Sequence, residues 1–253
     1  MTAARGPAFH NYFGPQASQY ADIRPTYPAA LFHFLALAAG GTALAWDCGT
    51  GNGQAAVGLA ERFARVLGTD PSEAMIAVAT AHPRVTYRTA LYDTGLDEHS
   101  ANLVTAAQAL HWFDLEPFLR EARRVLMPHG VLAVWCYTMC RIEPAIDELV
   151  NRHYQVTTGP YWPAERKHTE DGYRSIALPI EEIVVPPFEL TASWRLDHAL
   201  RYVRTWSGTR RYMDARGEEG QLAFEAAMRE RWGQPWLRRR VTWPVHARVG
   251  ELL

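Results

Sequence analysis

A glycine-rich turn between an apolar run and a helical pattern is the segment of this sequence best suited to chemistry. Residues 42–47 have the length of a strand and end in an acid, and Gly49, Gly51 and Gly53 follow them. Glycines let the backbone approach a ligand closely, and the free N–H groups at the start of a helix favour an anionic group. A tight strand-to-helix turn without a ligand is the alternative. The pattern predicts a ligand-binding loop.

A second carboxylate, Asp70, ends the next apolar run, 23 residues after Asp47. Nucleotide-binding α/β folds place at this point an acid that accepts hydrogen bonds from ribose hydroxyls. The dinucleotide fingerprint G-x-G-x-x-G/A is the competing motif. It requires a small residue where Gln54 stands, so an NAD-dependent oxidoreductase is the runner-up interpretation.

The elements that must position these residues follow a regular rhythm. Between residues 42 and 137, short apolar runs alternate with helical patterns. Such alternation predicts βαβ units and a mostly parallel sheet buried on both faces, closed as a doubly wound α/β sandwich. After about residue 141 the rhythm gives way to aromatic-rich segments, with a helix expected at 198–212, an extended pair at 183–185 and 188–196, and a last strand at 239–249.

Composition excludes several classes of protein. The chain has 253 residues, 48% of them hydrophobic, and a formal net charge of -1, so neither disorder nor a general attraction to nucleic acid or anionic membranes is expected. Its three cysteines form no disulfide framework or metal-ligand set, which predicts no metal site and suits a reducing compartment. The longest apolar stretch, residues 31–46, is too short to span a membrane. We expect a soluble, cytoplasmic protein.

Charge is unevenly distributed along the chain. Residues 201–253 hold 11 arginines and 6 acidic residues, an excess of 5 positive charges, whereas the rest of the chain is net negative. A solvated surface explains this pattern, and a site that attracts an anionic small molecule explains it as well.

The segment Asp47-Cys48-Gly49-Thr50-Gly51-Asn52-Gly53 resembles motif I of the class I S-adenosylmethionine-dependent methyltransferases. Asp70-Pro71-Ser72 with Met75 resembles the acidic loop of that family, and residues 124–132 resemble its "RVLxPGG" corner, with His129 in place of a glycine. Together with the segment from Tyr20 to Pro28, the chain resembles the methyltransferase type 11 group and its trans-aconitate methyltransferase branch. The resemblance implies a seven-stranded Rossmann-like sheet, S-adenosylmethionine as cofactor and methyl transfer to a small molecule.

The resemblance also implies a role for individual residues. Gly49 and Gly51 would pass the methionine part of the cofactor, and Asp47 would help hold its amino group. Asp70 would bind the ribose hydroxyls. The remaining cofactor contacts implied are those of Pro71 and Met75 beside the adenine, backbone contacts from Ala90 and Leu91, and Gln108 at the methionine end.

Two charged or titratable side chains have open roles. Arg24 could pair with the cofactor's carboxylate or with a substrate anion, or lie at the surface beside a turn. His111 follows the expected fourth strand and could be a general base, a substrate hydrogen-bonding group, or a residue packed on Trp112. A carboxylate acceptor is already ionised at pH 7 and needs no base, whereas a phenol or amine does. The Asn/Asp-Pro-Pro-Tyr/Phe motif of nucleic-acid and amide methylation is absent after the expected fourth strand, which favours a small-molecule substrate. With the positive tail and Arg24, we expect a small acidic or otherwise oxygen-bearing metabolite.

Three segments are expected within one structural domain. Residues 1–40 form an N-terminal cap segment that closes over the cofactor, residues 41–140 the cofactor-binding core, and residues 141–253 a substrate cap followed by the final strands of the same sheet. Besides the oxidoreductase, a non-catalytic cofactor-binding partner protein is an alternative. The oligomeric state, monomer or homodimer, is left open.

Overall fold

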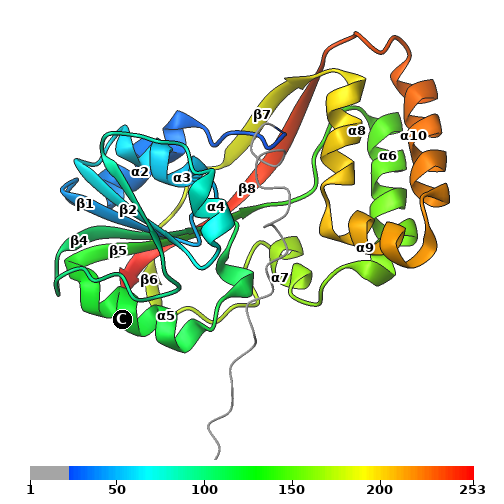
Figure 1. Ribbon diagram of the computed structural model, residues 1–253. Helices are drawn as coiled ribbons and strands as arrows, with labels where there is room; N and C mark the ends of the chain where they lie inside the picture. Colours follow the sequence, from blue (N-terminus) through cyan, green and yellow to red (C-terminus); the bar gives the residue numbers. More distant parts are fainter. Residues whose placement is uncertain (1–22) are drawn as a thin grey trace, which may run out of the picture.

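A single large sheet organises the protein (Figure 1). The computed structural model describes residues 23–253; the rest of the expected N-terminal cap, including Tyr20, lies outside this range. The sheet has eight strands in the order β3-β2-β1-β4-β5-β8-β6, and β7 pairs with β8. The strands are β1 (Leu44–Cys48), β2 (Arg65–Asp70), β3 (Val85–Thr89), β4 (Ala101–Ala107), β5 (Leu126–Tyr137), β6 (Ile180–Glu182), β7 (Phe188–Trp194) and β8 (Arg239–Leu252).

The first five strands run parallel, and β8 is antiparallel to β5. This arrangement confirms the predicted doubly wound, mostly parallel sheet. It has one strand more than the family resemblance implies, because β8 is 14 residues long. One stretch of β8 pairs with β7 and its last residues pair with β6. The extended pair expected at 183–185 and 188–196 is therefore wrong: residues 183–185 form no strand, and the second segment, β7, pairs with β8.

Helices cover both faces of the sheet, as the all-buried pattern of β1 and the buried run of residues 130–137 in β5 require. Two helices, α2 (Ala29–Ala38) and α3 (Gln54–Ala60), pack on one face through buried residues such as Leu35 and Leu59. On the other face, α5 (Leu115–Val125) contributes Phe118 and Val125 to a second core cluster. The short helix α4 (Glu73–Ala77) follows β2.

The C-terminal half adds a helical lobe beside the sheet (Figure 1). Its helices are α6 (Pro144–Arg152), a π-helical turn (His153–Thr157), a 3-10 turn (Gly159–Tyr161), α7 (Arg166–Glu170), α8 (Leu196–Arg204), α9 (Ser207–Arg216) and α10 (Glu219–Trp232). The single helix expected at 198–212 is wrong: it breaks into α8 and α9, because Trp206 adopts an extended conformation (φ -65°, ψ 136°). Aromatic side chains from β7, α8 and β8, including Trp194, Tyr202 and Trp243, form the core of this lobe.

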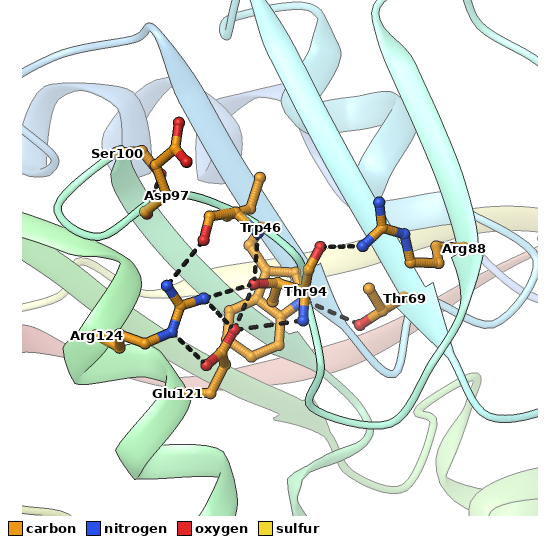
Figure 2. A network of polar contacts seen from close by, with 9 residues as sticks. Trp46, Thr69, Arg88, Thr94, Asp97, Ser100, Glu121 and Arg124 are labelled. Carbon is orange, nitrogen blue, oxygen red and sulfur yellow. Dashed lines mark hydrogen bonds and ion pairs between the residues drawn. The ribbon is translucent and has the colours of Figure 1, made fainter.

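A polar network fixes the segment that follows β3 (Figure 2). Arg124 on α5 donates from Nε and Nη2 to the two carboxylate oxygens of Glu121, at 2.8 and 2.7 Å, and from Nη1 to the carbonyl of Leu96 at 2.8 Å. Thr94 donates its hydroxyl to the same carboxylate, and its carbonyl accepts from Arg88 on β3. The pKa of Glu121 is lowered, chiefly by the hydrogen bond from Arg124. The network therefore ties the segment that follows β3 to α5.

In the part of the chain that the structure describes, no helix has the length and apolar character needed to cross a bilayer.

Candidate active site

The glycine loop is held from below by a buried carboxylate. Asp47, the next-to-last residue of β1, is 0% exposed. Its two oxygens accept hydrogen bonds from the hydroxyls of Thr50, at 2.6 Å, and Thr105, at 2.7 Å. Burial raises the pKa of Asp47 to about 6, although both hydroxyls lower it. Asp47 thus connects the glycine loop, through Thr50, to β4, through Thr105.

Glycine is required at three points of the loop, Gly49, Gly51 and Gly53, and the first two lie on the side where a ligand would bind. Gly49 and Gly51 have φ values of +68° and +56°, a region that other residues rarely adopt. A Cβ on Gly49 would lie 2.7 Å from the Cβ of Ala109, and one on Gly51 would lie 3.3 Å from the Cε of Met75. A side chain at Gly49 or Gly51 would therefore occupy part of the cavity that the loop borders.

Asp70 ends β2 at the rim of this space. One of its carboxylate oxygens accepts the N–H of Gly51 at 2.9 Å, and the other accepts the N–H of Ser72 at 2.9 Å. Burial raises the pKa of Asp70, and the two N–H donors lower it. Each oxygen keeps a further lone pair, so the carboxylate can accept hydrogen bonds from a ligand.

These residues border a cavity of about 990 Å³, open to solvent, which we name the glycine-loop cleft. It lies at the carboxyl ends of β1, β2, β4 and β5, the place where ligands bind in open α/β sheets. Its lining is Arg24, Tyr27, Cys48, Gly49, Thr50, Gly51, Asn52, Gln54, Ala55, Asp70, Pro71, Ser72, Met75, Leu91, Ala107, Gln108, Ala109, Trp112, Phe113 and Tyr137.

Gln108, directly after β4, has a left-handed backbone with φ +54°. Its N–H donates to the carbonyl of Trp135 at 2.7 Å, and its side-chain oxygen accepts the N–H of Tyr137 at 2.8 Å. A non-glycine residue in this conformation is held there by its surroundings, and such strain is concentrated at functional sites. Both hydrogen bonds fix Gln108 against the end of β5.

A second cavity, of about 680 Å³, adjoins the cleft; we name it the arginine pocket. Its lining is Arg24, Gln108, His111, Trp112, Tyr137, Thr138, Met139, Trp162, Pro163, Arg166, Tyr202, Thr205, Trp206 and Ser207. Four residues line both cavities: Arg24, Gln108, Trp112 and Tyr137. The guanidinium of Arg24 donates to the hydroxyl of Tyr137 at 3.0 Å and lies 5.2 Å from the ring centre of Tyr202. The two cavities therefore meet at these four side chains, which we name the neck.

His111 lies in the arginine pocket, away from the cleft. Its Nδ1 is 2.9 Å from the hydroxyl of Tyr173, and its ring packs 4.7 Å from that of Trp112. Burial, with the positive charge of Arg166 adding to it, lowers the pKa of His111 to about 3. The imidazole is therefore neutral at physiological pH.

Most of the predicted cofactor residues line the glycine-loop cleft, namely Arg24, Gly49, Gly51, Asp70, Pro71, Met75, Leu91 and Gln108. Two do not. Asp47 is fully buried with its threonine partners and lies outside the lining, as does Ala90.

Sequence reasoning missed Tyr27, Tyr137 and Arg166 as site residues. Tyr137 is the last residue of β5, so the rule that ligands meet strand ends could have found it. Arg166 begins α7, far from every motif, and no local signal marks it. None of the described residues form a group of His, Cys, Asp or Glu able to hold a metal ion.

Comparison with known proteins agrees with this geometry. Residues 46–134 match the family model of a methyltransferase domain. A Dictyostelium discoideum protein, provisionally named a methyltransferase, is 34% identical to this chain over 212 residues. The match covers 82% of this chain and 81% of that protein. A Saccharomyces cerevisiae protein provisionally named as an S-adenosylmethionine-dependent methyltransferase is 27% identical, covering 64% of this chain and 58% of its own. A solved structure from Anaeromyxobacter dehalogenans, provisionally described as a type II methyltransferase, is 44% identical with a TM-score of 0.86, covering 91% of this chain and 98% of its own.

The chain belongs to the methyltransferase domain family, and it is a class I S-adenosylmethionine-dependent methyltransferase. The cleft fits that cofactor by its own chemistry. The bare glycine loop leaves room that a Cβ on Gly49 or Gly51 would occupy. Asp70 offers a carboxylate to ribose hydroxyls, and Met75, Leu91 and Phe113 supply apolar walls for a flat base.

Proposed function

We propose that the protein methylates an oxygen nucleophile, a carboxylate or a hydroxyl, of a small molecule held in the arginine pocket. The observation that carries this proposal is the neck, where Arg24, Gln108, Trp112 and Tyr137 border both cavities. A donor in the cleft and an acceptor in the pocket would meet there. The donor would then pass its methyl group directly to the acceptor, without a covalent intermediate on the protein.

We propose that Asp70 holds the ribose of S-adenosylmethionine, that Gly49 and Gly51 admit its methionine part, and that Met75 and Leu91 flank its adenine. When bound, the cofactor would supply an activated methyl group: the carbon would bond to the acceptor oxygen, the carbon–sulfur bond would break with its electron pair left on sulfur, and a hydroxyl acceptor would release its proton to solvent. The protein has to align the two reactants and exclude water. We propose that Gln108, held by its two hydrogen bonds, and the ring of Trp112 do so.

The acceptor is proposed to be an acidic or oxygen-bearing metabolite. Support comes from Arg24 and Arg166, two guanidinium groups in one pocket, and from the neutral His111, which is a poor base for an acceptor that has to lose a proton. The segment from Arg24 to Pro28 also supports the trans-aconitate methyltransferase branch, on its resemblance to that branch alone.

A labelled-methyl assay tests this function. With methyl-labelled S-adenosylmethionine and panels of carboxylates, phenols and amines, we expect label in an ester or an ether. Trp112→Ala should lower kcat/KM for that acceptor by about 10-fold or more, because alignment at the neck is lost. The control is Trp236→Ala, since Trp236 is 67% exposed and lines neither cavity. Transfer to amines only, or equal activity of Trp112→Ala and wild type, would contradict the proposal.

A further inference from the structure

Among residues 23–253, the side chain of Arg166 contacts two aromatic side chains. Its Nε donates to the hydroxyl of Tyr154 at 2.9 Å. Its guanidinium carbon lies 4.9 Å from the ring centre of Trp162 and 5.5 Å from that of Tyr154. Among residues 23–253 no carboxylate forms an ion pair with it; Glu170 reaches it only through the Tyr154 hydroxyl, which donates to the Glu170 carboxylate.

The terminal N–H groups of the Arg166 side chain remain available to a ligand in the arginine pocket. In the described part of the chain, the side chain of Arg166 donates one hydrogen bond, from Nε to Tyr154. Both Nη nitrogens therefore keep their N–H groups, and a guanidinium edge with two parallel N–H groups matches a carboxylate or a phosphate. The positive charge of Arg166 also acts on His111, whose pKa it helps to lower.

The surroundings of Arg166 add to the preference for an anion. The pocket reaches Thr205, Trp206 and Ser207, where α9 begins. No side chain caps this ten-residue helix, so its first N–H groups and the positive end of its dipole lie at the pocket wall. The rings of Trp162 and Trp206 form apolar walls beside the guanidinium.

Arg166 lines the arginine pocket and not the glycine-loop cleft, whereas Arg24 lines both. An anion on Arg166 is therefore set back from the neck, where the methyl group would be transferred. We infer that Arg166 binds an anionic group of the acceptor that does not react, a carboxylate or phosphate on a flat apolar body, while a second oxygen of the same molecule lies at the neck. This inference rests on the proposed function and makes Arg166 the residue that selects acidic acceptors.

Matched pairs of small aromatic probes test the inference. Tryptophan fluorescence would be used to titrate benzoate against benzamide, 4-hydroxybenzoate against 4-hydroxybenzamide, and phenyl phosphate against phenol, each with saturating S-adenosylhomocysteine. We expect at least one anion to bind about 10-fold or more tightly than its neutral partner. The pair that shows the preference separates a carboxylate from a phosphate.

Two variants locate the preference on Arg166. Arg166→Gln should remove it, and Arg166→Lys, which keeps the charge but loses the planar fork, should retain part of it. Arg201→Gln is the control, because Arg201 is exposed on α8 and pairs with Asp197. Affinity for S-adenosylhomocysteine should stay unchanged in every variant.

The two failures are distinguishable. If no anion binds better than its neutral partner, or if Arg166→Gln and Arg166→Lys keep the full preference, the inference is overturned while the proposed function stands. If the wild type does not bind S-adenosylhomocysteine, the proposed function falls and takes the inference with it.

Discussion

His111 has a neutral imidazole because its place beside Trp112 and Tyr173 removes water from the ring and Arg166 adds a repelling charge. A group whose pKa is about 3 accepts a proton too weakly to act as a general base near pH 7. The hydrogen bond to Tyr173 instead fixes the ring as part of the pocket wall. This favours the substrate-binding or packing role over the catalytic one.

We predict that His111→Asn raises KM for the oxygen acceptor and lowers kcat by less than about 10-fold. Because the pKa of His111 lies below the usual 6.5, the ring stays neutral from pH 5 to pH 9 and should add no inflection to the kcat profile in that range. Steady-state kinetics of both proteins across this pH range check the prediction. A fall in kcat of about 100-fold, with loss of an inflection near neutrality, would show that His111 is a base.

The turn between β1 and α3 depends on glycine for two separable reasons. Positive φ is costly for any residue with a Cβ, and close neighbours exclude the Cβ itself. Gly49 has both constraints, since its φ is +68° and Ala109 lies 2.7 Å from the place of a Cβ. Gly40, after α2, has a φ of +62° and no atom within 4 Å of that place. Substituting Gly49 and Gly40 in parallel therefore separates the cost of backbone strain from the effect of a side chain on the shape of the glycine loop.

We predict that Gly49→Ala and Gly40→Ala both lower the free energy of unfolding, by about 1–2 kcal/mol for the backbone alone. Only Gly49→Ala should also weaken binding of S-adenosylhomocysteine, by about 10-fold or more, because the loop has to shift. Thermal unfolding and calorimetric titration of the two variants measure this. Equal affinities would mean that the loop does not shape the cofactor site.

The elements most predictable from sequence were those with local signals. The two strands that carry Asp47 and Asp70 at or next to their ends, and the glycine turn, follow from apolar runs, acids and glycines that are adjacent in the chain. Arg166 could not be predicted, because its place depends on how α7 packs against Trp162 and Tyr154. The same holds for Asp47, whose burial depends on Thr105 from β4.

At the scale of the whole molecule, β8 joins the two halves of the site. Its early residues pair with β7 beside the helical lobe, and its later residues pair with β5 in the sheet. The lobe supplies Trp162, Tyr202 and Trp206 to the arginine pocket, while the sheet supplies Gln108 and Tyr137 to the neck. β8 thus connects the lobe that lines the arginine pocket with the sheet that lines the neck.

Calorimetric titration of S-adenosylhomocysteine tests the central claim most directly, with NAD as the competing ligand. We predict saturable binding to one site in the wild type, no comparable binding of NAD, and about 10-fold or more weaker binding of S-adenosylhomocysteine in Asp70→Asn, because charge-assisted hydrogen bonds to the ribose are lost. Asp97→Asn, at an exposed position in the network of Figure 2, should bind as the wild type does. Absence of binding, equal affinity in Asp70→Asn, or tighter binding of NAD would contradict the claim that this cleft is a methyl-donor site.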